Sequence, residues 1–583
     1  MYQDLQGMKA NLYKCFITRA WDLGSQDGIA GFLHPEGPYD DPKGGRLRAA
    51  SYPRLKGHYQ FINELCLFVE VDHHAKYSVN VFACQAKDNN RFCHISNLFH
   101  PSTIDGCLTH DGLGAVPGIK TDDNHWDTRP HRSRVIEVSR QSLEIFARLY
   151  DEAGTPLEQA RLPVLHSREI VAVLEKIANQ AFKVGDLEGG YFATVMFDET
   201  ASQRDGSIRR ETCFPKNVNE WIISGPHFYI GTPFNKTPNE GCSHNLDYSE
   251  IDLSAIPEDY LPRTNYVSAC TPAEYALRIP RWKGTPVTAF YRHINREMLS
   301  PTGERTLIAT IIPPGPAHIN TVFSLCFCDL ESLLLFSGYA SSLLYDFSVK
   351  TAGVGHINVS HISALPLPSL KCISHTMMRR VLRLNCLTNH YSGLWASMRI
   401  VLSEPDGFAL TDPRCTWPVY ETPEWCHSCA FRSDYGRRQA FVELDALAAL
   451  SLDLVEEELI TIYRIQFPVL RQYERENLYD QTGRLVPKGV LDLAKLHNVD
   501  IRQRLNVSTF TGPLELIGEV ETPGLGVTGG IVWEDPKMEP RMKRVYPPPF
   551  TKCDREADMR QAYRAFQERL RSTADTIPAQ LES

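Results

Sequence analysis

The spacing of apolar residues predicts an amphipathic helix close to residue 12. Leu12, Phe16, Ala20 and Leu23 recur at helical spacing, with charged residues between them. A face of this kind is normally buried against the rest of a globular domain. We therefore expect these four side chains to lie in the core.

Three apolar stretches predict strands after this helix. The stretch GIAGFLHP (28–35) lacks polar alternation, which is typical of a strand covered on both faces in a parallel sheet. The stretches 58–71 and 77–84 follow it, and HHAK (73–76) separates them by a gap of hairpin size. A helix, a buried strand and a hairpin make up about half of a doubly wound α/β domain.

The pattern then changes several times along the chain. Residues 88–135 are rich in His, Asp, Gly and Pro and predict an irregular segment, and residues 139–182 predict two helices. Strand patterns follow, and Asp329 is placed to cap an apolar helix over 330–350. Helices are predicted over 373–480, and the remainder is rich in Pro and charge, with one helix near 554–572. These changes divide the chain into 1–87, 88–185, 186–370, 371–483 and 484–583.

Composition describes an ordinary globular protein. The chain has 583 residues, for which roughly two to four domains are expected. A net charge of −9 argues against a generally basic nucleic-acid coat but allows a local basic face. No signal peptide is predicted, because the N-terminus lacks a continuous apolar core. No membrane span is predicted, because the apolar stretch at 330–350 carries Glu331 and Asp346. We therefore expect a cytoplasmic protein with its 16 cysteines as reduced thiols.

Four segments in a fixed order resemble one family of DNA-modifying enzymes. The first runs from LYKCFITRAW (12–21) through GIAGFLHP to a hairpin that ends in YSVNVF (77–82). The others are DYLPRTNYVSAC (259–270), the stretch from ERTLIATIIPPGPAHINTVFSL to GHINVSHISALPLP (304–368), and ITIYRIQFPVLRQYERENLYD (460–480). In this order they resemble the large class I adenine-specific DNA methyltransferases of the Eco57I-like type, which depend on S-adenosylmethionine and occur in restriction–modification and phage-defence systems. The resemblance extends over most of residues 8–480.

The resemblance implies a fold: α/β, with the rear half of a Rossmann-like methyltransferase sheet, a mixed α/β target-recognition domain and a helical C-terminal region. It also implies a reaction, in which an adenine flipped from double-stranded DNA is methylated on its amino nitrogen. In the family, a glycine-containing loop binds S-adenosylmethionine, and an Asn/Asp-Pro-Pro-aromatic tetrapeptide accepts the amino hydrogens.

Neither motif occurs in this sequence. The nearest stretches, YPPPF (546–550) and GTPF (231–234), lack the acceptor side chain that the reaction needs. We therefore expect no catalytic and no cofactor-binding residue here. The expected partners are double-stranded DNA and a separate N-terminal methyltransferase half or other defence-system subunits. S-adenosylmethionine would be bound mainly by the separate half.

Candidate DNA contacts lie in the part that resembles a target-recognition domain. Basic and aromatic residues interleave between 263 and 305, a composition that suits contact with a DNA backbone and with extrahelical bases. The loop VKTAGVGHINVS (349–360) offers one phosphate contact and two base-edge groups. The alternatives are a solvated face for the basic span and a left-handed turn that closes a helix for the loop. The predicted DNA contacts are Arg263, Arg281, Lys283, Arg305, Lys350, His356 and Asn358, and Tyr77 is a candidate for stacking on the flipped base.

Two motifs raise the question of a metal. CHSC (426–429) supplies only half of a zinc site, so we interpret its cysteines as plain thiols. HHAK (73–76) fits a solvated hairpin tip better than a set of ligands. No metal is expected.

Four functions stay open at this point. The chain is the recognition and rear portion of an adenine methyltransferase, or a DNA-binding specificity subunit without catalysis. A defence nuclease ranks below both, because we find no Asp…Glu-x-Lys cluster in strand context. The fourth reading is a non-functional remnant.

Overall fold

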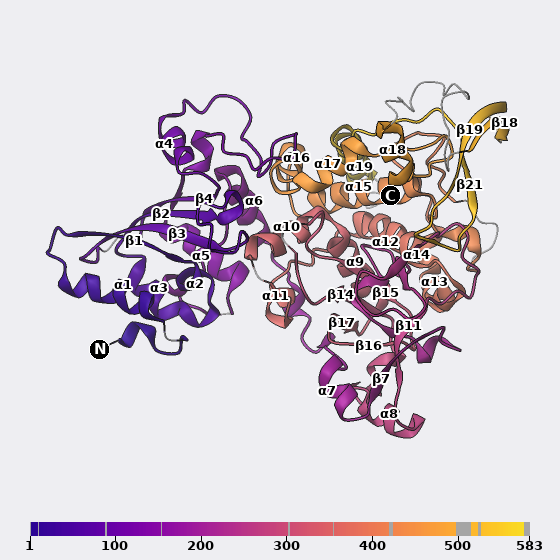
Figure 1. The fold of residues 1–583 in the computed structure, drawn as a ribbon, viewed down its shortest axis with the longest axis horizontal. Helices are drawn as coiled ribbons and strands as arrows, with labels where there is room; N and C mark the ends of the chain where they lie inside the picture. Colours follow the sequence, from indigo (N-terminus) through magenta and orange to yellow (C-terminus); the bar gives the residue numbers. More distant parts are fainter. Residues whose placement is uncertain are drawn as a thin grey trace.

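The computed structural model describes residues 2–9, 11–87, 90–152, 154–300, 303–353, 355–418, 424–496, 515–522 and 526–576. An N-terminal α/β lobe lies beside a larger body that holds the rest of the chain (Figure 1). Helix α6 (Arg168–Ala178) packs on α16 (Glu456–Gln466), which packs on α10 (Leu343–Ala352). These helices join the lobe to the body.

A five-stranded sheet in the order β1-β3-β2-β4-β5 forms the N-terminal lobe. Strands β1 (Ile29–Pro35) and β2 (Leu55–Ile62) both pair antiparallel with β3 (Lys76–Ala83), so β1 and β2 run parallel to each other. Strand β4 (Phe92–Leu98) is parallel to β2, and β5 (Ile136–Val138) is antiparallel to β4. The carboxyl ends of β1, β2 and β4 therefore meet beside the start of β3. In open α/β sheets, ligands bind outside such carboxyl ends.

Three expectations for this lobe are wrong. Strand β1 lies at the edge of the sheet with Ile29 and Leu33 exposed, although its apolar run predicts cover on both faces. The strand expected over 58–71 ends at Ile62, so the connection to β3 is a loop over 63–75 instead of a short hairpin. Residues 88–135, expected to be irregular, supply β4 to the sheet and helix α4 (Ser102–Thr109).

Helix α1 (Leu12–Leu23) forms where the sequence predicts it but buries a different face. Trp21 is buried and packs edge-on against Phe82 of β3, with ring centroids 5.5 Å apart. Leu12, Phe16 and Leu23 are 74%, 62% and 71% exposed. The indole is the largest apolar side chain of the helix, and its burial sets the orientation. We call the free edge of β1, together with these exposed residues of α1 and β1, the open edge.

The remaining helices of the lobe lie along the sheet and at the border with the body. Helices α5 (Arg140–Tyr150) and α6 confirm the two helices expected over 139–182. The short helices of the crossover between β1 and β2 are α2 (Gly37–Asp40) and α3 (Gly45–Ser51).

The middle of the chain builds several small sheets. The largest has four strands in the order β15-β14-β17-β6, and the others pair β11 with β7, β12 with β13, β16 with β8, and β10 with both β9 and β20. The strands are β6 (Tyr191–Thr194), β7 (Ile208–Cys213), β8 (Ile222–Ile223), β9 (Lys236–Pro238), β10 (Tyr248–Ile251), β11 (Thr264–Ser268), β12 (Arg281–Trp282), β13 (Thr285–Pro286), β14 (Arg292–Arg296), β15 (Ala309–Ile312), β16 (Ala317–His318) and β17 (Val322–Phe327). Two short helices, α7 (Glu199–Arg204) and α8 (Pro272–Arg278), lie with β7 at one end of the body (Figure 1).

The apolar stretch at 330–350 is buried, as predicted, but it forms two helices. Asp329 caps α9 (Leu330–Ser341) by accepting a hydrogen bond from the backbone N–H of Ser332 at 2.6 Å. The helix is interrupted at Ser342, which has an extended backbone, and α10 begins at the next residue. The Arg305 guanidinium donates to the carbonyls of Ser341 and Ser342 at 3.0 and 2.9 Å, which satisfies acceptors freed by the break.

The last part of the chain is helical but is not a simple tail. Helix α19 (Arg555–Thr576) packs along α15 (Asp434–Ser451), so residues after 484 belong to the core of the body. Strands β18 (Glu515–Thr522), β19 (Gly526–Glu534) and β21 (Lys543–Tyr546) form a sheet, and β20 (Met538–Glu539) pairs with β10. The helix expected near 554–572 is confirmed as α19, whereas the strands of this region were not expected. The other helices are α11 (Val359–Ser363), α12 (Lys371–Asn385), α13 (Ser392–Ser397), α14 (Arg399–Ser403), α17 (Pro468–Glu476) and α18 (Lys488–Leu496).

Within the described residues, no helix is both long enough and apolar enough to cross a membrane.

Candidate nucleic-acid interface

The basic span at 263–305 does not form one surface. Arg263 is half-buried and pairs with Glu539 at 2.7 Å. Arg281 and Lys283 are exposed on the β12–β13 turn, where Lys283 donates to the sulfur of Cys328 at 3.1 Å. Trp282, one of the interleaved aromatics, is buried. Two exposed cations of the span, Arg281 and Lys283, have no anionic partner among the described residues, whereas Arg263 and the exposed Arg278 each have one.

Arg305 and Lys350 point into the body, so neither head group is free to contact a phosphate. Arg305 is buried and pairs with Asp346 at 2.6 Å, and the side chain of Asp346 is 0% exposed. Lys350 donates to the backbone carbonyl of Gln466 at 2.6 Å and lies over the ring of Phe467. The prediction of Arg305 as a DNA contact is wrong, because its charge compensates a buried carboxylate. Lys350 likewise belongs to helix packing.

Lys350 gives a pH-dependent prediction. Burial lowers the pKa of Lys350 from 10.5 to about 8, so the folded state holds this proton less tightly than the unfolded chain does. The charged ammonium then costs stability below pH 8, and the cost disappears as the pH rises from about 8 to 10.5. We expect Lys350→Met to gain stability relative to the unchanged protein at pH 7, and the gain to shrink by about 1–3 kcal/mol toward pH 10.5.

Urea unfolding at a series of pH values measures this difference. Lys283→Met is the matched control: Lys283 is exposed, and its replacement should change the free energy of unfolding by about 0.5 kcal/mol or less. A constant difference between Lys350→Met and the unchanged protein across this range would contradict the assignment.

The other predicted residues come together where the lobe meets the body. Tyr77 lies opposite Pro35 of β1 and Phe61 of β2, at the carboxyl ends of both strands. The ammonium of Lys76 lies 3.6 Å from the position that a Cβ atom would take at Gly353. The loop at 349–360 therefore lies beside this end of the sheet. We call this region the junction: the loop 63–75, Lys76 and Tyr77 on one side, and residues 353 and 355–358 on the other.

The body side of the junction combines a helix end and a helix start. Gly353 ends α10 in a left-handed conformation with φ of +69°, which confirms the alternative of a closing turn. His356 is exposed and contacts Glu297 through Nδ1 at 2.8 Å. Asn358 caps α11 by accepting from the backbone N–H of His361 at 3.2 Å. Both side chains remain at the surface, although each has a structural partner.

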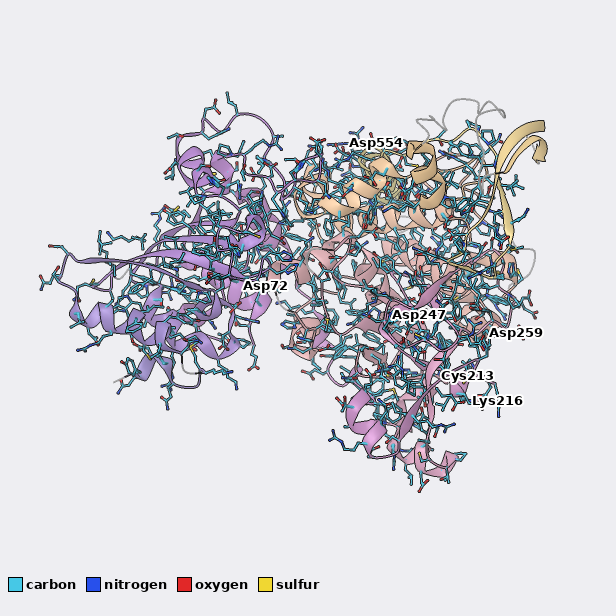
Figure 2. The ribbon with its side chains drawn as sticks, viewed as in Figure 1. Asp72, Cys213, Lys216, Asp247, Asp259 and Asp554 are labelled. Atoms are coloured by element: carbon cyan, nitrogen blue, oxygen red, sulfur yellow. The ribbon has the colours of Figure 1, made fainter. Side chains whose placement is uncertain are left out.

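The lobe side of the junction is a pre-formed loop. The buried Asn63 amide donates to the carbonyls of Phe68 and Val71 at 2.8 and 2.9 Å, and its oxygen accepts from the N–H of Phe68. Figure 2 shows Asp72 of this loop on the side of the lobe that borders the body. One asparagine thus holds the loop in place from inside.

Tyr77 is less available for base stacking than the sequence suggests. Its ring stacks on Phe61 with centroids 5.4 Å apart, and the exposed Phe68 ring meets it edge-on at 5.1 Å. Its buried hydroxyl has no hydrogen-bond partner among the described residues. Phe68, which sequence reasoning passed over, covers Tyr77 and faces solvent.

A buried polar chain crosses the sheet behind the junction. His58 contacts Glu36 through Nε2 at 3.3 Å and His94 through Nδ1 at 2.9 Å. Burial alone would raise the pKa of Glu36, but His58 holds that pKa below its usual range, and burial holds the pKa of His94 well below its own. The sequence pattern of β2 and β4 predicts only that His58 and His94 lie in the core. The contact between the two histidines becomes visible only when β2 pairs with β4. The polar chain links the segment after β1 to the centre of the sheet.

The two metal-like motifs stand apart. His73 and His74 lie in the loop 63–75 with Glu64, and one ligand atom from each lies within 4.8 Å of the others. Both histidines are exposed, as expected, although they do not form a hairpin tip. Cys426 and Cys429 lie on a short turn against α12, far along the chain from this loop.

Comparison with known proteins gives structural likenesses at low sequence identity. No family model matches the sequence. No curated protein matches it either. The structure is similar to the type IIG restriction endonuclease BpuSI, with 11% sequence identity, a TM-score of 0.24 and coverage of 80% of this chain and 50% of that one. It is also similar to the type IIL restriction-modification enzyme MmeI, solved in complex with DNA, with 9% identity, a TM-score of 0.28 and coverage of 79% and 51%. The chain thus spans about half the length of each.

Proposed function

We propose that this chain is the DNA-recognition and rear catalytic-domain portion of an adenine-N6-specific DNA methyltransferase of a restriction–modification or phage-defence system. The observation that carries the proposal is the junction. It brings the carboxyl ends of β1 and β2 beside the loop 353–358, two segments that resemble the catalytic and target-recognition parts of one family. Carboxyl ends of parallel strands are the usual ligand-binding edge of such a sheet.

The strand order supports the catalytic part of the proposal. An antiparallel β3 lies between two parallel strands, β1 and β2, which a crossover through α2 and α3 connects. This arrangement fits the rear of a Rossmann-like methyltransferase sheet, as the sequence resemblance implies. The cofactor S-adenosylmethionine would then be bound mainly by a separate half.

The open edge is where that separate half would join. Strand β1 pairs only with β3 among the described strands, so one row of its backbone N–H and C=O groups has no partner strand. Ile29 and Leu33 on β1 and Leu12, Phe16 and Leu23 on α1 are exposed beside it. An unpaired strand with apolar neighbours is suited to receive a strand from another polypeptide.

Co-production with the polypeptide encoded directly upstream tests the proposal. We expect S-adenosylmethionine binding and N6-methyladenine in plasmid DNA only when both chains are present. Leu33→Lys should abolish both, whereas Leu113→Lys, a change of another exposed leucine away from the open edge, should leave them intact.

Two results would count against the proposal. Site-specific duplex binding by this chain alone, with no methylation under any pairing, would favour the non-catalytic specificity subunit. Absence of both DNA binding and methylation would overturn both functions.

A further inference from the structure

Cys426 and Cys429 lie in contact. Their sulfur atoms are 3.3 Å apart, on the turn Cys426–His427–Ser428–Cys429. A disulfide has sulfurs about 2.05 Å apart, so closure needs a movement of little more than 1 Å. The backbone N–H of Cys429 donates to the carbonyl of Cys426 at 3.0 Å, which holds the two ends of the turn together.

The two thiols differ in access and in chemistry. Cys426 is half-buried, and its sulfur contacts the Ser428 hydroxyl at 3.2 Å. Although burial opposes ionisation, hydrogen bonds from Ser428 and Cys429 hold the pKa of Cys426 below its usual range. Cys429 is fully buried, and burial raises its pKa to about 12. A reachable, more acidic thiol next to a buried one matches the division between an attacking and a resolving cysteine.

We propose that Cys426 and Cys429 form a thiol–disulfide exchange site whose substrate is a low-molecular-weight disulfide. The Cys426 thiolate attacks one sulfur of that disulfide, which forms a mixed disulfide and releases one thiolate. Cys429 then loses its proton to solvent and attacks the Cys426 sulfur, which closes the Cys426–Cys429 bond and releases the second thiolate. Two protein thiols are oxidised, and one disulfide is reduced to two thiols.

The surroundings fit a closed and rigid dithiol better than a metal centre. In the described part of the chain, no third His, Cys, Asp or Glu joins this pair within the spacing that a metal ion needs, whereas Glu64, His73 and His74 do meet that spacing elsewhere. The Cys429 carbonyl accepts from Arg383 of α12 at 2.8 Å, and the Trp425 indole donates to the Cys386 carbonyl at 2.8 Å. The turn is thus tied to the core on both sides of Cys426.

The test uses the full chain, reduced and then equilibrated in buffers of reduced and oxidised glutathione. Alkylation followed by mass spectrometry reports each cysteine. We expect Cys426 and Cys429 to lose alkylation together, and the peptide that carries both to appear two hydrogens lighter. Exposed Cys66 and Cys328 are internal controls, which should form mixed disulfides only.

Two variants separate the roles of the cysteines. Cys429→Ser should trap glutathione on Cys426, and Cys426→Ser should leave Cys429 alkylated only after unfolding. The proposal is overturned if Cys426 and Cys429 become alkylated independently at every ratio of the glutathione pair. It is also overturned if the unchanged protein purifies with one equivalent of zinc that Cys426→Ser removes.

Discussion

Replacing Asp346 with alanine is expected to lower the free energy of unfolding by about 3–5 kcal/mol, because the change leaves a buried guanidinium without its counter-charge. Arg305 and Asp346 are both buried, and the Asp346 carboxylate also accepts from the backbone N–H of Thr306 at 3.0 Å. Chemical denaturation of the full chain, followed by intrinsic fluorescence, measures the loss.

Two further variants show whether the loss comes from the unpaired charge. Replacing both partners, Arg305→Met with Asp346→Leu, should recover a large part of the stability, because no charge then remains in the core. Arg281→Met removes an exposed arginine and should change the free energy of unfolding by about 0.5 kcal/mol or less. An Asp346→Ala variant within about 1 kcal/mol of the unchanged protein would rule out the buried pair as a major source of stability.

Replacing Lys76 with alanine is expected to weaken duplex DNA binding roughly tenfold near physiological salt and to reduce the dependence on log salt concentration by about one unit. Lys76 is half-buried at the junction and has an ammonium with no hydrogen-bond or ion-pair partner among the described residues. A phosphate contact is independent of sequence, so the loss should be similar for specific and non-specific duplexes.

Fluorescence anisotropy over a range of salt concentrations measures both effects. Lys283→Ala is the matched control: it removes an exposed lysine on the β12–β13 turn, which is not part of the junction, and should leave the affinity unchanged. If Lys283→Ala weakens binding and Lys76→Ala does not, the DNA lies against the basic span and not at the junction.

The local sequence pattern was sufficient to predict many helices and strands, but not which other elements they pack against. The helices at 139–182, the cap at Asp329 and the buried nature of 330–350 follow from periodicity and capping chemistry within one segment. The buried face of α1 does not follow from the local pattern. The face that holds Trp21 and the face that holds Leu12 both have apolar residues at helical spacing, and the contact of Trp21 with Phe82 of β3 decides which face is buried.

In the candidate site, too, local features could be predicted from the sequence and contacts between distant segments could not. The sequence suggests that Arg305 is an exposed cation. The fold pairs it with Asp346, and nothing in the sequence around Asp346 indicates this pairing. Lys76 is not among the predicted DNA contacts, because its proximity to Gly353 of a distant loop appears only in the fold. The closing turn at Gly353, in contrast, is a local event, and glycine after a helix indicates it directly.

The open edge also bears on how the protein behaves when it is made without a partner. Native edge strands are usually protected by charged side chains, by prolines within the strand or by a covering element. Strand β1, IAGFLHP, carries no Lys, Arg, Asp or Glu, and its one proline lies at its last residue. Copies produced alone should therefore associate through this edge as their concentration rises, and oligomers should grow in proportion to the excess over any partner. A polypeptide that paired with this edge would then protect the chain from aggregation.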